Sequence, residues 1–246
     1  MSVNTMPQNP TVSVIIPVHN GARYLAEAIE SALAQTHPSQ EIIVVDDGST
    51  DGSATIAARY GPPVRLTATA HVGAPIARNH AASLATGDWL AFLDADDRWL
   101  PEKSAQQLAA ATRVGETIAF GGVRHFLSPE LDASTRQRLY CPPNVEHGPM
   151  PSNFFVRRDT FIALGGFDPR WRVGELLDWY GRATDAGYRA VTIPELVLHR
   201  RVHTANYSLT AAPQHVDLAR IAKRTIDRRR ALGLLPAREP NGEQPQ

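Results

Sequence analysis

The chain has 246 residues, of which 43% are hydrophobic and 20% are charged. This composition is close to the globular average, and the length suits one large domain or two closely packed halves, so a fibrous or wholly disordered protein is excluded. Lys and Arg together number 25, and Asp and Glu also number 25, which leaves no global basic field that could hold nucleic acid. We therefore expect no nucleic-acid partner, and an anionic ligand would need a local site.

Cysteine usage and hydropathy indicate where such a protein would work. The single cysteine, Cys141, cannot form an intrachain disulfide or a cysteine zinc cluster, which fits a reducing compartment. It lies in the loop-like stretch CPPN with no base beside it, which argues against a catalytic nucleophile. No stretch reaches the roughly 20 apolar residues of a membrane span, and MSVNTMPQNP lacks the order of a signal peptide. We expect a cytoplasmic location, with peripheral contact to the inner face of the membrane left open.

The first half of the chain alternates strand and helix patterns. The β-branched run VSVIIPV at 12–18 predicts a strand, and apolar residues at helical spacing predict a helix within 19–35. EIIVVDD at 41–47 predicts a second buried strand, which is followed by a short helix at 55–60 and a third strand at 64–70. Strands that are apolar throughout and separated by helices are typical of a parallel sheet covered on both faces.

Two acidic segments follow strands in this half. The segment 74–87 predicts a helix that ends at Gly87, and 88–94 predicts the next strand. DDGSTDGS (46–53) and DADD (94–97) therefore both lie just beyond the carboxyl ends of strands. Because ligands bind at that edge of open α/β sheets, both are candidates for a binding site, although Asp, Gly and Ser also favour plain turns.

The second acidic segment crowds three carboxylates, Asp94, Asp96 and Asp97, into four positions. Such like charges repel one another unless a cation, a cluster of N–H groups or solvent relieves them. Which of the three applies largely decides the function of the chain.

The pattern is less regular after Pro101. The predicted elements are, in chain order, a helix at 103–112, a strand at 117–126, a proline-rich connection at 128–152, a strand at 153–158, a helix at 159–166, a helix at 173–187 and strands at 188–193 and 195–203. Within the helix at 173–187, Leu176, Leu177 and Tyr180 have the spacing of a buried face.

The C-terminal region combines a helix pattern with basic charge. Residues 214–232 predict a helix, and from Asp217 to Arg230 the chain carries six Lys or Arg against two Asp. Its apolar stripe consists of Leu218, Ile221, Ala222, Thr225 and Ile226. Two interpretations stay open, a surface helix packed through this stripe and a helix that docks on a membrane surface or a partner. The ending AREPNGEQPQ has a disordered composition.

Four stretches, in chain order, resemble the family 2 glycosyltransferases. They are VSVIIPVHNGARYLAEAIESALAQ, EIIVVDDGSTDGS, HVGAPIARNHAASLATGDWLAFLDADD and GGFDPRWRVGELLDWYGRA, and the resemblance extends over residues 12–205. It implies a GT-A fold, an α/β architecture with a mostly parallel central sheet flanked by helices. It also implies an inverting transferase that moves a sugar from a nucleoside diphosphate sugar to an acceptor hydroxyl.

The resemblance assigns a metal site to the acidic segment. Asp94, Ala95 and Asp96 resemble the DxD motif of the family, with Asp96 as the metal ligand and Asp94 nearer the ribose or a metal-bound water. His203 is a candidate third ligand or phosphate donor, and Asp97 would cap the following turn. Carboxylate oxygens suit Mn²⁺ or Mg²⁺, and such a cation would stabilise the charge that grows on the leaving diphosphate. We therefore expect Mn²⁺ or Mg²⁺ as the cofactor.

The resemblance also implies residues that bind the nucleobase. Pro17 and His19 would lie against the base, although many members have an aromatic residue where this chain has His19. A carboxylate of Asp46 or Asp47 would accept the N3–H of uracil, with a strand-end cap as the alternative for Asp46. This favours a UDP-sugar, such as a UDP-hexose, as the donor.

Three arginines are implied in diphosphate binding. Arg78 matches the ARN pattern of the family, in which the arginine contacts the diphosphate or the DxD carboxylates. Arg200 and Arg201 resemble the C-terminal loop that closes over the diphosphate.

The base is the least regular part of the resemblance. Inverting transfer needs a carboxylate that deprotonates the acceptor hydroxyl, and the family supplies it as an Asp in an acidic pair at a helix start, where GELLDW has Leu176. Glu175 and Asp178 are three residues apart and share a helix face, so either is a candidate. We predict Glu175 because it stands at the helix start, with Asp178 second. The alternative for Asp178 is a bond to Arg182 one turn later.

The predicted organisation follows from these sites. Residues 1–10 would form a flexible N-terminus, 11–100 a nucleotide-sugar-binding half, 101–212 an acceptor-binding half of the same GT-A domain, and 213–246 a basic helix with a disordered tail. The acceptor stays open between a glycan, a lipid-linked sugar, a peptide and a small molecule. The loss of the usual Asp at Leu176 keeps one rival function, a nucleotide-sugar-binding protein without catalysis. A nucleotidyltransferase would need a phosphate loop of glycine and lysine near the first strand, which this sequence lacks.

Overall fold

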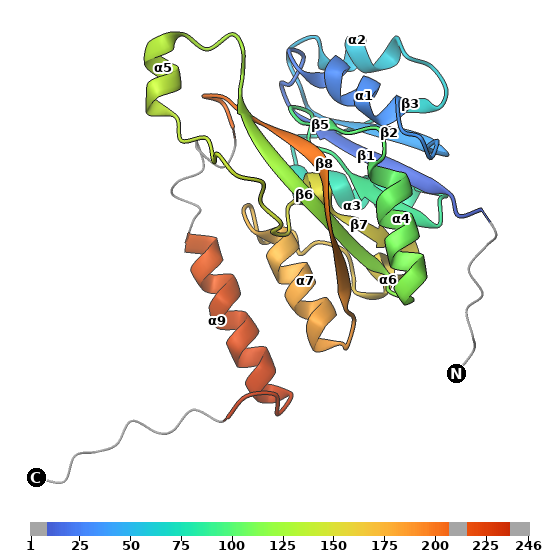
Figure 1. Ribbon diagram of the computed structural model, residues 1–246, viewed down its shortest axis with the longest axis vertical. Coiled ribbons are helices and arrows are strands. Elements are labelled where there is room, and N and C mark those ends of the chain that lie inside the picture. Colours follow the sequence, from blue (N-terminus) through green and yellow to red (C-terminus); the bar gives the residue numbers. More distant parts are fainter. Residues whose placement is uncertain (1–8, 207–215, 237–246) are drawn as a thin grey trace, which may run out of the picture.

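The structure is a computed structural model that describes residues 9–206 and 216–236. Its centre is an eight-stranded sheet with the order β3-β2-β1-β4-β7-β6-β8-β5 (Figure 1). The strands are β1 Val12–Val18, β2 Glu41–Asp47, β3 Val64–Thr69, β4 Trp89–Phe92, β5 Arg98–Trp99, β6 Ile118–Leu127, β7 Phe155–Arg157 and β8 Ala190–Val202. The predicted α/β fold is confirmed.

The sheet has a parallel half and a mixed half, and two strands of the mixed half, β7 and β5, run opposite to the other six. β3, β2, β1 and β4 are all parallel, so their carboxyl ends lie at one edge. β7 is antiparallel to both β4 and β6, while β6 and β8 are parallel to each other. The two predicted halves, 11–100 and 101–212, therefore share one sheet, joined where β4 pairs with β7 and where β5 pairs with β8. The boundary between them stays a prediction.

Helices cover both faces of the sheet. They are α1 Leu25–Leu33, α2 Ser53–Ala58, α3 Ala74–Leu84, α4 Lys103–Val114, α5 Ala133–Arg138, α6 Arg158–Ala163, α7 Glu175–Asp185 and α9 Val216–Ala231, with a 3-10 turn η1 at Pro151–Asn153. Along β1, Val14 and Ile16 join the core cluster under α1 and α4, whereas Ile15 joins the cluster under α3, α6 and α7. Because both faces are covered, β1, β2 and β4 are buried along their whole length and are mostly apolar.

β8 is a single strand where the sequence predicted two strands separated at Pro194. The strand continues through Pro194, which has no N–H to donate to a neighbour. Its register against β6 slips at this point, from Phe120 opposite Thr192 to Gly122 opposite Leu196. The irregular pairing accommodates the proline, so the strand does not break.

α3 ends at Leu84, three residues before the predicted end at Gly87. The backbone is already extended at Ala85. Gly87 is needed for a different reason, because an added Cβ there would lie 2.7 Å from the backbone nitrogen of Ser13 in β1. The glycine therefore permits a close approach to β1 and does not cap the helix.

The short elements β5, α5 and η1 were not predicted. β5 has only two residues and pairs antiparallel with β8, and α5 lies inside the proline-rich connection, where the carboxylate of Asp132 accepts the N–H of Thr135 as an N-cap. The predicted face of α7 is correct for Leu176 and Tyr180, which pack in the core. It is wrong for Leu177, which is 46% exposed.

The predicted C-terminal helix is present as α9, which packs beside α7 (Figure 1). Its stripe is only partly covered, because Ile221 is buried and Thr225 half-buried, whereas three members are exposed, namely Leu218, Ala222 and Ile226. In the part of the chain that the structure describes, none of the helices is both long and apolar enough to cross a membrane. The tail 237–246 and the first eight residues of the predicted N-terminus lie outside the described residues.

Candidate active site

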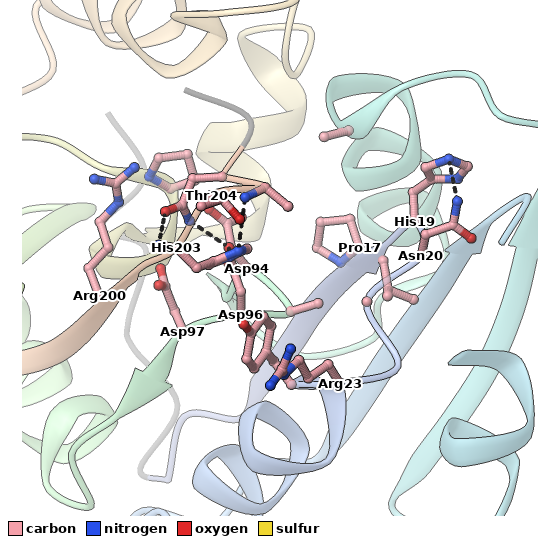
Figure 2. Close-up of a pocket in the computed structure, with 18 of the residues that line it drawn as sticks. Pro17, His19, Asn20, Arg23, Asp94, Asp96, Asp97, Arg200, His203 and Thr204 are labelled. Atoms are coloured by element: carbon pink, nitrogen blue, oxygen red, sulfur yellow. Dashed lines mark hydrogen bonds and ion pairs between the residues drawn. The ribbon is translucent and has the colours of Figure 1, made fainter. Parts of the chain in front are cut away.

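A cavity of about 820 Å³ opens at the carboxyl edge of the parallel strands. Nine of the predicted site residues line it, namely Pro17, His19, Asp47, Arg78, Asp94, Asp96, Glu175, Arg200 and His203. Asp46, Asp178 and Arg201 are not among its lining residues. Figure 2 shows His203 and the acidic residues on one side of the cavity, His19 and Asn20 on the other, and Pro17 between them. This edge is where open α/β sheets bind ligands.

The acidic cluster consists of Asp94, Asp96 and Asp97. One carboxylate oxygen from each residue lies within 4.8 Å of the others. Asp97 is buried, and its Oδ1 accepts the N–H of Arg201 at 3.0 Å, so it ties the cluster to β8 and does not cap the following turn as predicted. Burial, and then the charges of Asp96 and Asp94, raise the pKa of Asp97 well above its usual range. A bound cation would relieve this repulsion.

Asp96 is oriented by two side chains that follow β8. Its Oδ2 lies 2.9 Å from Nε2 of His203 and accepts an N–H from Asn206 at 3.0 Å. The His203 ring also packs on the ring of Tyr24, with centroids 4.8 Å apart. The carboxylate oxygens are the donors that fit Mn²⁺ or Mg²⁺. The residues at this wall of the cavity are therefore suited to a hard divalent cation.

Arg78 joins the acidic cluster to Glu175. Its guanidinium is buried, with Nη2 donating to Asp94 at 2.5 Å and Nη1 donating to Glu175 at 2.6 Å. Burial alone would lower the pKa of Arg78, but the two carboxylates outweigh it and raise that pKa. The arginine therefore stays charged and holds one carboxylate on each side.

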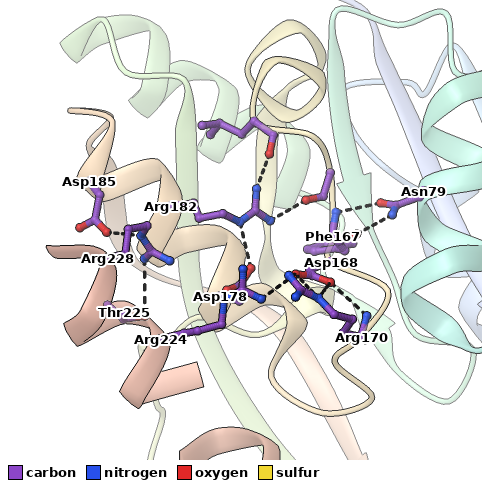
Figure 3. A network of polar contacts seen from close by, with 12 residues as sticks. Asn79, Phe167, Asp168, Arg170, Asp178, Arg182, Asp185, Arg224, Thr225 and Arg228 are labelled. Carbon is purple, nitrogen blue, oxygen red and sulfur yellow. Dashed lines mark hydrogen bonds and ion pairs between the residues drawn. The ribbon is translucent and has the colours of Figure 1, made fainter. Parts of the chain in front are cut away.

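The two candidate bases have different surroundings. Glu175 is the first residue of α7 and is buried at the cavity wall, where burial, opposed by the charge of Arg78, raises its pKa. Asp178 is 1% exposed and accepts a hydrogen bond from Nε of Arg182 at 2.9 Å (Figure 3). This is the arrangement given above as the alternative for Asp178. Leu176 is buried in the core at 3% exposed.

Asp47 lies at the opposite end of the cavity and is held by three donors. It accepts the hydroxyl of Thr69 and two backbone N–H groups, those of Val72 and Gly73, each at 2.7 Å. Burial would raise the pKa of Asp47, but these hydrogen bonds outweigh it and lower that pKa. Asp46 instead accepts the N–H of Ser49 at 2.9 Å, which is the strand-end cap given as its alternative.

His19 stands beside Asp47 and pairs with a second histidine. Its Nδ1 lies 2.8 Å from the carbonyl oxygen of Asp47, and its ring centroid is 4.1 Å from that of His71. His71 was not predicted, because nothing in HVGA marks it as part of this edge. His19 lines this end of the cavity, and His71 packs behind it without lining the cavity.

The two arginines of β8 point in different directions. Arg200 lines the cavity, whereas Arg201 is 2% exposed. Arg201 donates to Glu27 of α1 at 2.8 Å, and its guanidinium lies 4.5 Å from the ring centroid of Tyr24. Successive residues of a strand point to opposite faces, so the two side chains cannot share a role. Arg201 packs β8 against α1.

Other lining residues were missed because they belong to no periodic pattern. The Tyr24 hydroxyl donates to Glu130, and Arg23 lies 3.4 Å from the same carboxylate. Glu130 comes from the proline-rich connection before α5, so only its spatial neighbours reveal it. Asn206 offers a weak signal, since it follows His203 by three residues and its Oδ1 accepts the His203 N–H at 2.6 Å.

Comparison with known proteins places these observations in a family. The family model described as glycosyl transferase family 2 matches residues 13–172. An uncharacterized glycosyltransferase of Nostoc sp. (strain PCC 7120) is 32% identical over 226 residues, which cover 82% of this chain and 67% of the Nostoc protein. One from Rickettsia prowazekii (strain Madrid E) is 44% identical over 141 residues, which cover 55% of this chain and 42% of that protein. Matches to further Rickettsia relatives span less than half of the relative's length.

Solved structures share the fold at lower identity. The crystal structure of S. aureus TarS 1-349 in complex with UDP-GlcNAc superposes with a TM-score of 0.65 at 20% identity, covering 82% of this chain and 61% of TarS 1-349. The mannosyltransferase PcManGT from Pyrobaculum calidifontis, in complex with GDP-Man and Mn²⁺, gives a TM-score of 0.61 at 23% identity. It covers 81% of this chain and 59% of the mannosyltransferase. The likeness supports the GT-A type of fold.

Proposed function

Because this chain belongs to glycosyl transferase family 2, we propose that it is a metal-dependent inverting transferase that moves a sugar, a hexose of a UDP-sugar, to an acceptor hydroxyl. The observation that carries the proposal is a single cavity in which Arg78 links Asp94 of the acidic cluster to a separate buried carboxylate, Glu175. Such a reaction needs both features, a cation site for the leaving diphosphate and a base for the acceptor.

Asp96 is the proposed ligand of the cation, with Asp94 and His203 beside it. Mn²⁺ or Mg²⁺ bound here would supply positive charge to the diphosphate as it leaves. The protein contributes orientation, because Asn206 and His203 hold Oδ2 of Asp96 toward the cavity. Arg78 prevents Asp94 from turning away, since both ends of its guanidinium are engaged. PcManGT, a neighbour of the same fold, was solved with Mn²⁺.

Asp47 is the proposed reader of the uracil edge. A carboxylate offers about four acceptor positions, and three are filled by Thr69, Val72 and Gly73. One acceptor position remains for an N–H of a ligand in the cavity. The lowered pKa of Asp47 keeps its carboxylate ionised and able to accept that hydrogen bond. Because TarS was solved with UDP-GlcNAc and PcManGT with GDP-Man, the preference for uridine rests on Asp47 and not on the fold.

Glu175 is the proposed base. It would take the proton of the acceptor hydroxyl as that oxygen attacks the anomeric carbon from the face opposite the diphosphate. Arg78 favours its ionised form, while burial raises its proton affinity. These opposed effects suit a group that is ionised before the reaction and accepts a proton during it.

A donor screen tests the proposed activity. The protein is incubated with a panel of UDP-sugars and GDP-sugars in the presence of Mn²⁺, and released nucleotide is measured without any acceptor. We expect slow release from at least one UDP-sugar and loss of that release in excess EDTA. Tight UDP binding with no release from any donor would instead support the rival function, a nucleotide-sugar-binding protein without catalysis.

Substitution of the two carboxylates of α7 tests the assignment of the base. We expect Glu175→Gln to reduce turnover by about 10²–10⁴-fold while UDP affinity stays within a few-fold, because a base acts on the acceptor side. Asp178→Asn is the matched control on the same helix. It should keep its turnover and lose stability, because it weakens the bond to Arg182. The opposite pair of results would make Asp178 the base.

A further inference from the structure

We propose that α9 is a positioning element for the active site, acting on Glu175 through the backbone of residues 172–174. The inference rests on the proposed role of Glu175 as the base. It assigns a task to the C-terminal helix, which lies outside the matched family region of residues 13–172.

Residues 172–175 separate the cavity from α9. All four line the cavity on one side. On the other side of the same backbone, a Cβ added to Gly174 would lie 2.8 Å from Cδ2 of Leu218 and 2.9 Å from Cδ1 of Ile221. The wall is therefore one residue thick. A change in how these two side chains of α9 pack is transmitted directly to the surface of the cavity.

Gly174 is the joint on which Glu175 depends. Its φ of +84° lies in the left-handed region that favours glycine, and its carbonyl accepts the N–H of Asp178 at 3.1 Å in the first turn of α7. Glycine has no side chain that could fix this conformation by packing. Leu218 and Ile221 supply that packing from α9, and Ile221 is buried at 5% exposed.

A second contact holds the start of the same wall. Asp217 of α9 is buried at 7% exposed, and its Oδ2 accepts the backbone N–H of Arg172 at a long 3.4 Å. Trp171, which precedes Arg172 in the chain, is buried, and its ring centroid lies 5.8 Å from the guanidinium carbon of Arg224 in α9. α9 thus contacts the wall at two points, residue 172 and residue 174.

α9 is itself anchored away from the wall. Asp185, at the end of α7, accepts hydrogen bonds from Arg228 at 2.6 Å and Arg229 at 2.7 Å, and Figure 3 shows Arg228 between Asp185 and Thr225. The helix is therefore fixed at its C-terminal half by charge and presents its N-terminal half to Gly174. Two of its six basic side chains anchor the helix in this way, and a third, Arg224, lies near Trp171, so half of the basic charge of α9 has a structural use.

The expected effect is on turnover and not on donor binding. His19 lies across the cavity from the acidic cluster, with Pro17 between them (Figure 2), and the side chain of Asp47 is held by Thr69, Val72 and Gly73, none of which belongs to α9. A displacement of Glu175 by about 1 Å, by contrast, is enough to reduce a reaction rate by about 10²-fold. The two quantities should therefore separate in a variant of the α9 contact.

The test compares Ile221→Ala with Ile226→Ala. Both remove the same atoms from the same helix, but Ile226 is 41% exposed and is not in contact with Gly174. We expect Ile221→Ala to reduce kcat by about 10–100-fold with unchanged donor KM and UDP affinity, and Ile221→Val, which also lacks the Cδ1 atom that faces Gly174, to show a smaller loss in the same direction. Hydrogen–deuterium exchange of the peptide 172–182 should be faster in Ile221→Ala than in Ile226→Ala, whether or not the enzyme turns over.

Equal kcat and equal exchange of this peptide in the two alanine variants would overturn the proposal, even if Ile221→Ala melts at a lower temperature. That result would mean that α9 adds stability only. If Ile221→Ala does not fold, Ile221→Val decides by the same two measurements. If the wild-type protein shows no turnover, the proposed function fails, while the exchange comparison still supports or overturns the positioning by α9.

Discussion

Asp96, Asp94 and Asp97 are each engaged by a different partner, and this explains how three carboxylates can share one corner. Asp94 forms an ion pair with Arg78, and Asp97 accepts the backbone N–H of Arg201. Asp96 forms hydrogen bonds with His203 and Asn206. Only Asp97 is deeply buried among them. Asp94 and Asp96 are both oriented and open to the cavity, but Asp94 is already paired with an arginine, which makes Asp96 the residue whose removal should affect cation binding most.

We predict that Asp96→Asn weakens Mn²⁺-dependent binding of UDP by more than about 10-fold, which is the loss caused even by removing an outer partner of a metal ligand. The fold should be unaffected, because Asp96 lies at the solvent-facing edge of the sheet. Calorimetric titration of UDP with and without Mn²⁺ measures the effect. Asp227→Asn on α9 is the control, and equal UDP affinity in the two variants would remove Asp96 from the cation site.

If Glu175 is the base, its pKa sets how kcat decreases at acid pH. A protonated Glu175 cannot accept the proton of the acceptor, so kcat should fall as the pH decreases through its pKa. Burial raises this pKa above the ordinary 4.5 of glutamate, against the opposing charge of Arg78, so the acid limb should lie above 4.5. The rate is measured at saturating donor and Mn²⁺, with UDP affinity followed at each pH to separate titration of the cation site. A limb at or below 4.5 would argue against Glu175 as the base.

Lys103 is a residue-level feature that concerns stability alone. Its side chain is fully buried over the ring of Trp99, with Nζ 4.0 Å from the ring centroid and without a hydrogen-bond partner among the described residues. Burial lowers the pKa of Lys103 well below the 10.5 of free lysine. Between the two pKa values the unfolded chain binds the extra proton, so stability increases with pH up to 10.5.

We predict that Lys103→Met raises the melting temperature at neutral pH by at least about 2–4 °C, the shift that 1 kcal/mol produces in a domain of this size. The gain should shrink as the pH approaches 10.5, because Lys103 is then already neutral in the unfolded chain and its burial no longer requires the loss of a proton. Lys223→Met is the control, since Lys223 is on the surface of α9 with its side chain 78% exposed. A lower melting temperature for Lys103→Met at neutral pH would show that the amine is stabilising where it lies.

Among the elements, α9 is the one whose contacts were hardest to predict from the sequence. The basic residues were expected to be solvated or to face a membrane or partner. In the structure, Arg228 and Arg229 share Asp185, whose side chain is only 4% exposed. Burial would raise the pKa of Asp185, but the hydrogen bonds of the two arginines outweigh it and lower that pKa. Its contribution to stability is therefore present above the pKa of a free Asp and is lost as the pH falls through the lower folded value.

We predict that Asp185→Asn lowers the free energy of unfolding by about 2 kcal/mol at neutral pH, the range for hydrogen bonds to charged groups. The corresponding decrease in melting temperature is about 4–8 °C. Asp227→Asn breaks an exposed pair with Lys223 on the same helix and should change stability by less than about 0.5 kcal/mol. Equal effects of the two substitutions would mean that the Asp185 contacts do not anchor α9.

Regular elements could be predicted from periodicity, and the exceptions have local causes. The pattern breaks at Pro194 and at Gly87, and both residues normally interrupt an element. Here a slip in the pairing of β6 and β8 accommodates Pro194, and the close approach of β1 requires Gly87. Leu177 has helical spacing but lies on the outer side of α7. Each of these outcomes depends on a neighbour that is distant in the sequence.

For the whole molecule, the family motifs predicted the fold, and most of the site residues that they predicted line the cavity. Adjacent residues in a strand could not be separated, because motifs do not say which of two neighbours faces the site. Asp47 lines the cavity and Asp46 does not, and the same holds for Arg200 and Arg201. Contacts between residues distant in the chain could also not be predicted from the sequence. The pairing of Arg78 with Glu175 spans 97 residues and is visible only once the sheet is assembled.

The central claim is that one cavity holds a cation and a base on opposite sides of a reacting anomeric carbon, which requires inversion at that carbon. The most direct measurement is proton NMR of the sugar released from an α-linked UDP-sugar by the wild-type protein with Mn²⁺, recorded before mutarotation. The account predicts that the β anomer appears first, because the water attacks from the side of Glu175. First appearance of the α anomer would contradict the inverting mechanism, and absence of any released sugar from all donors would contradict catalysis at this site.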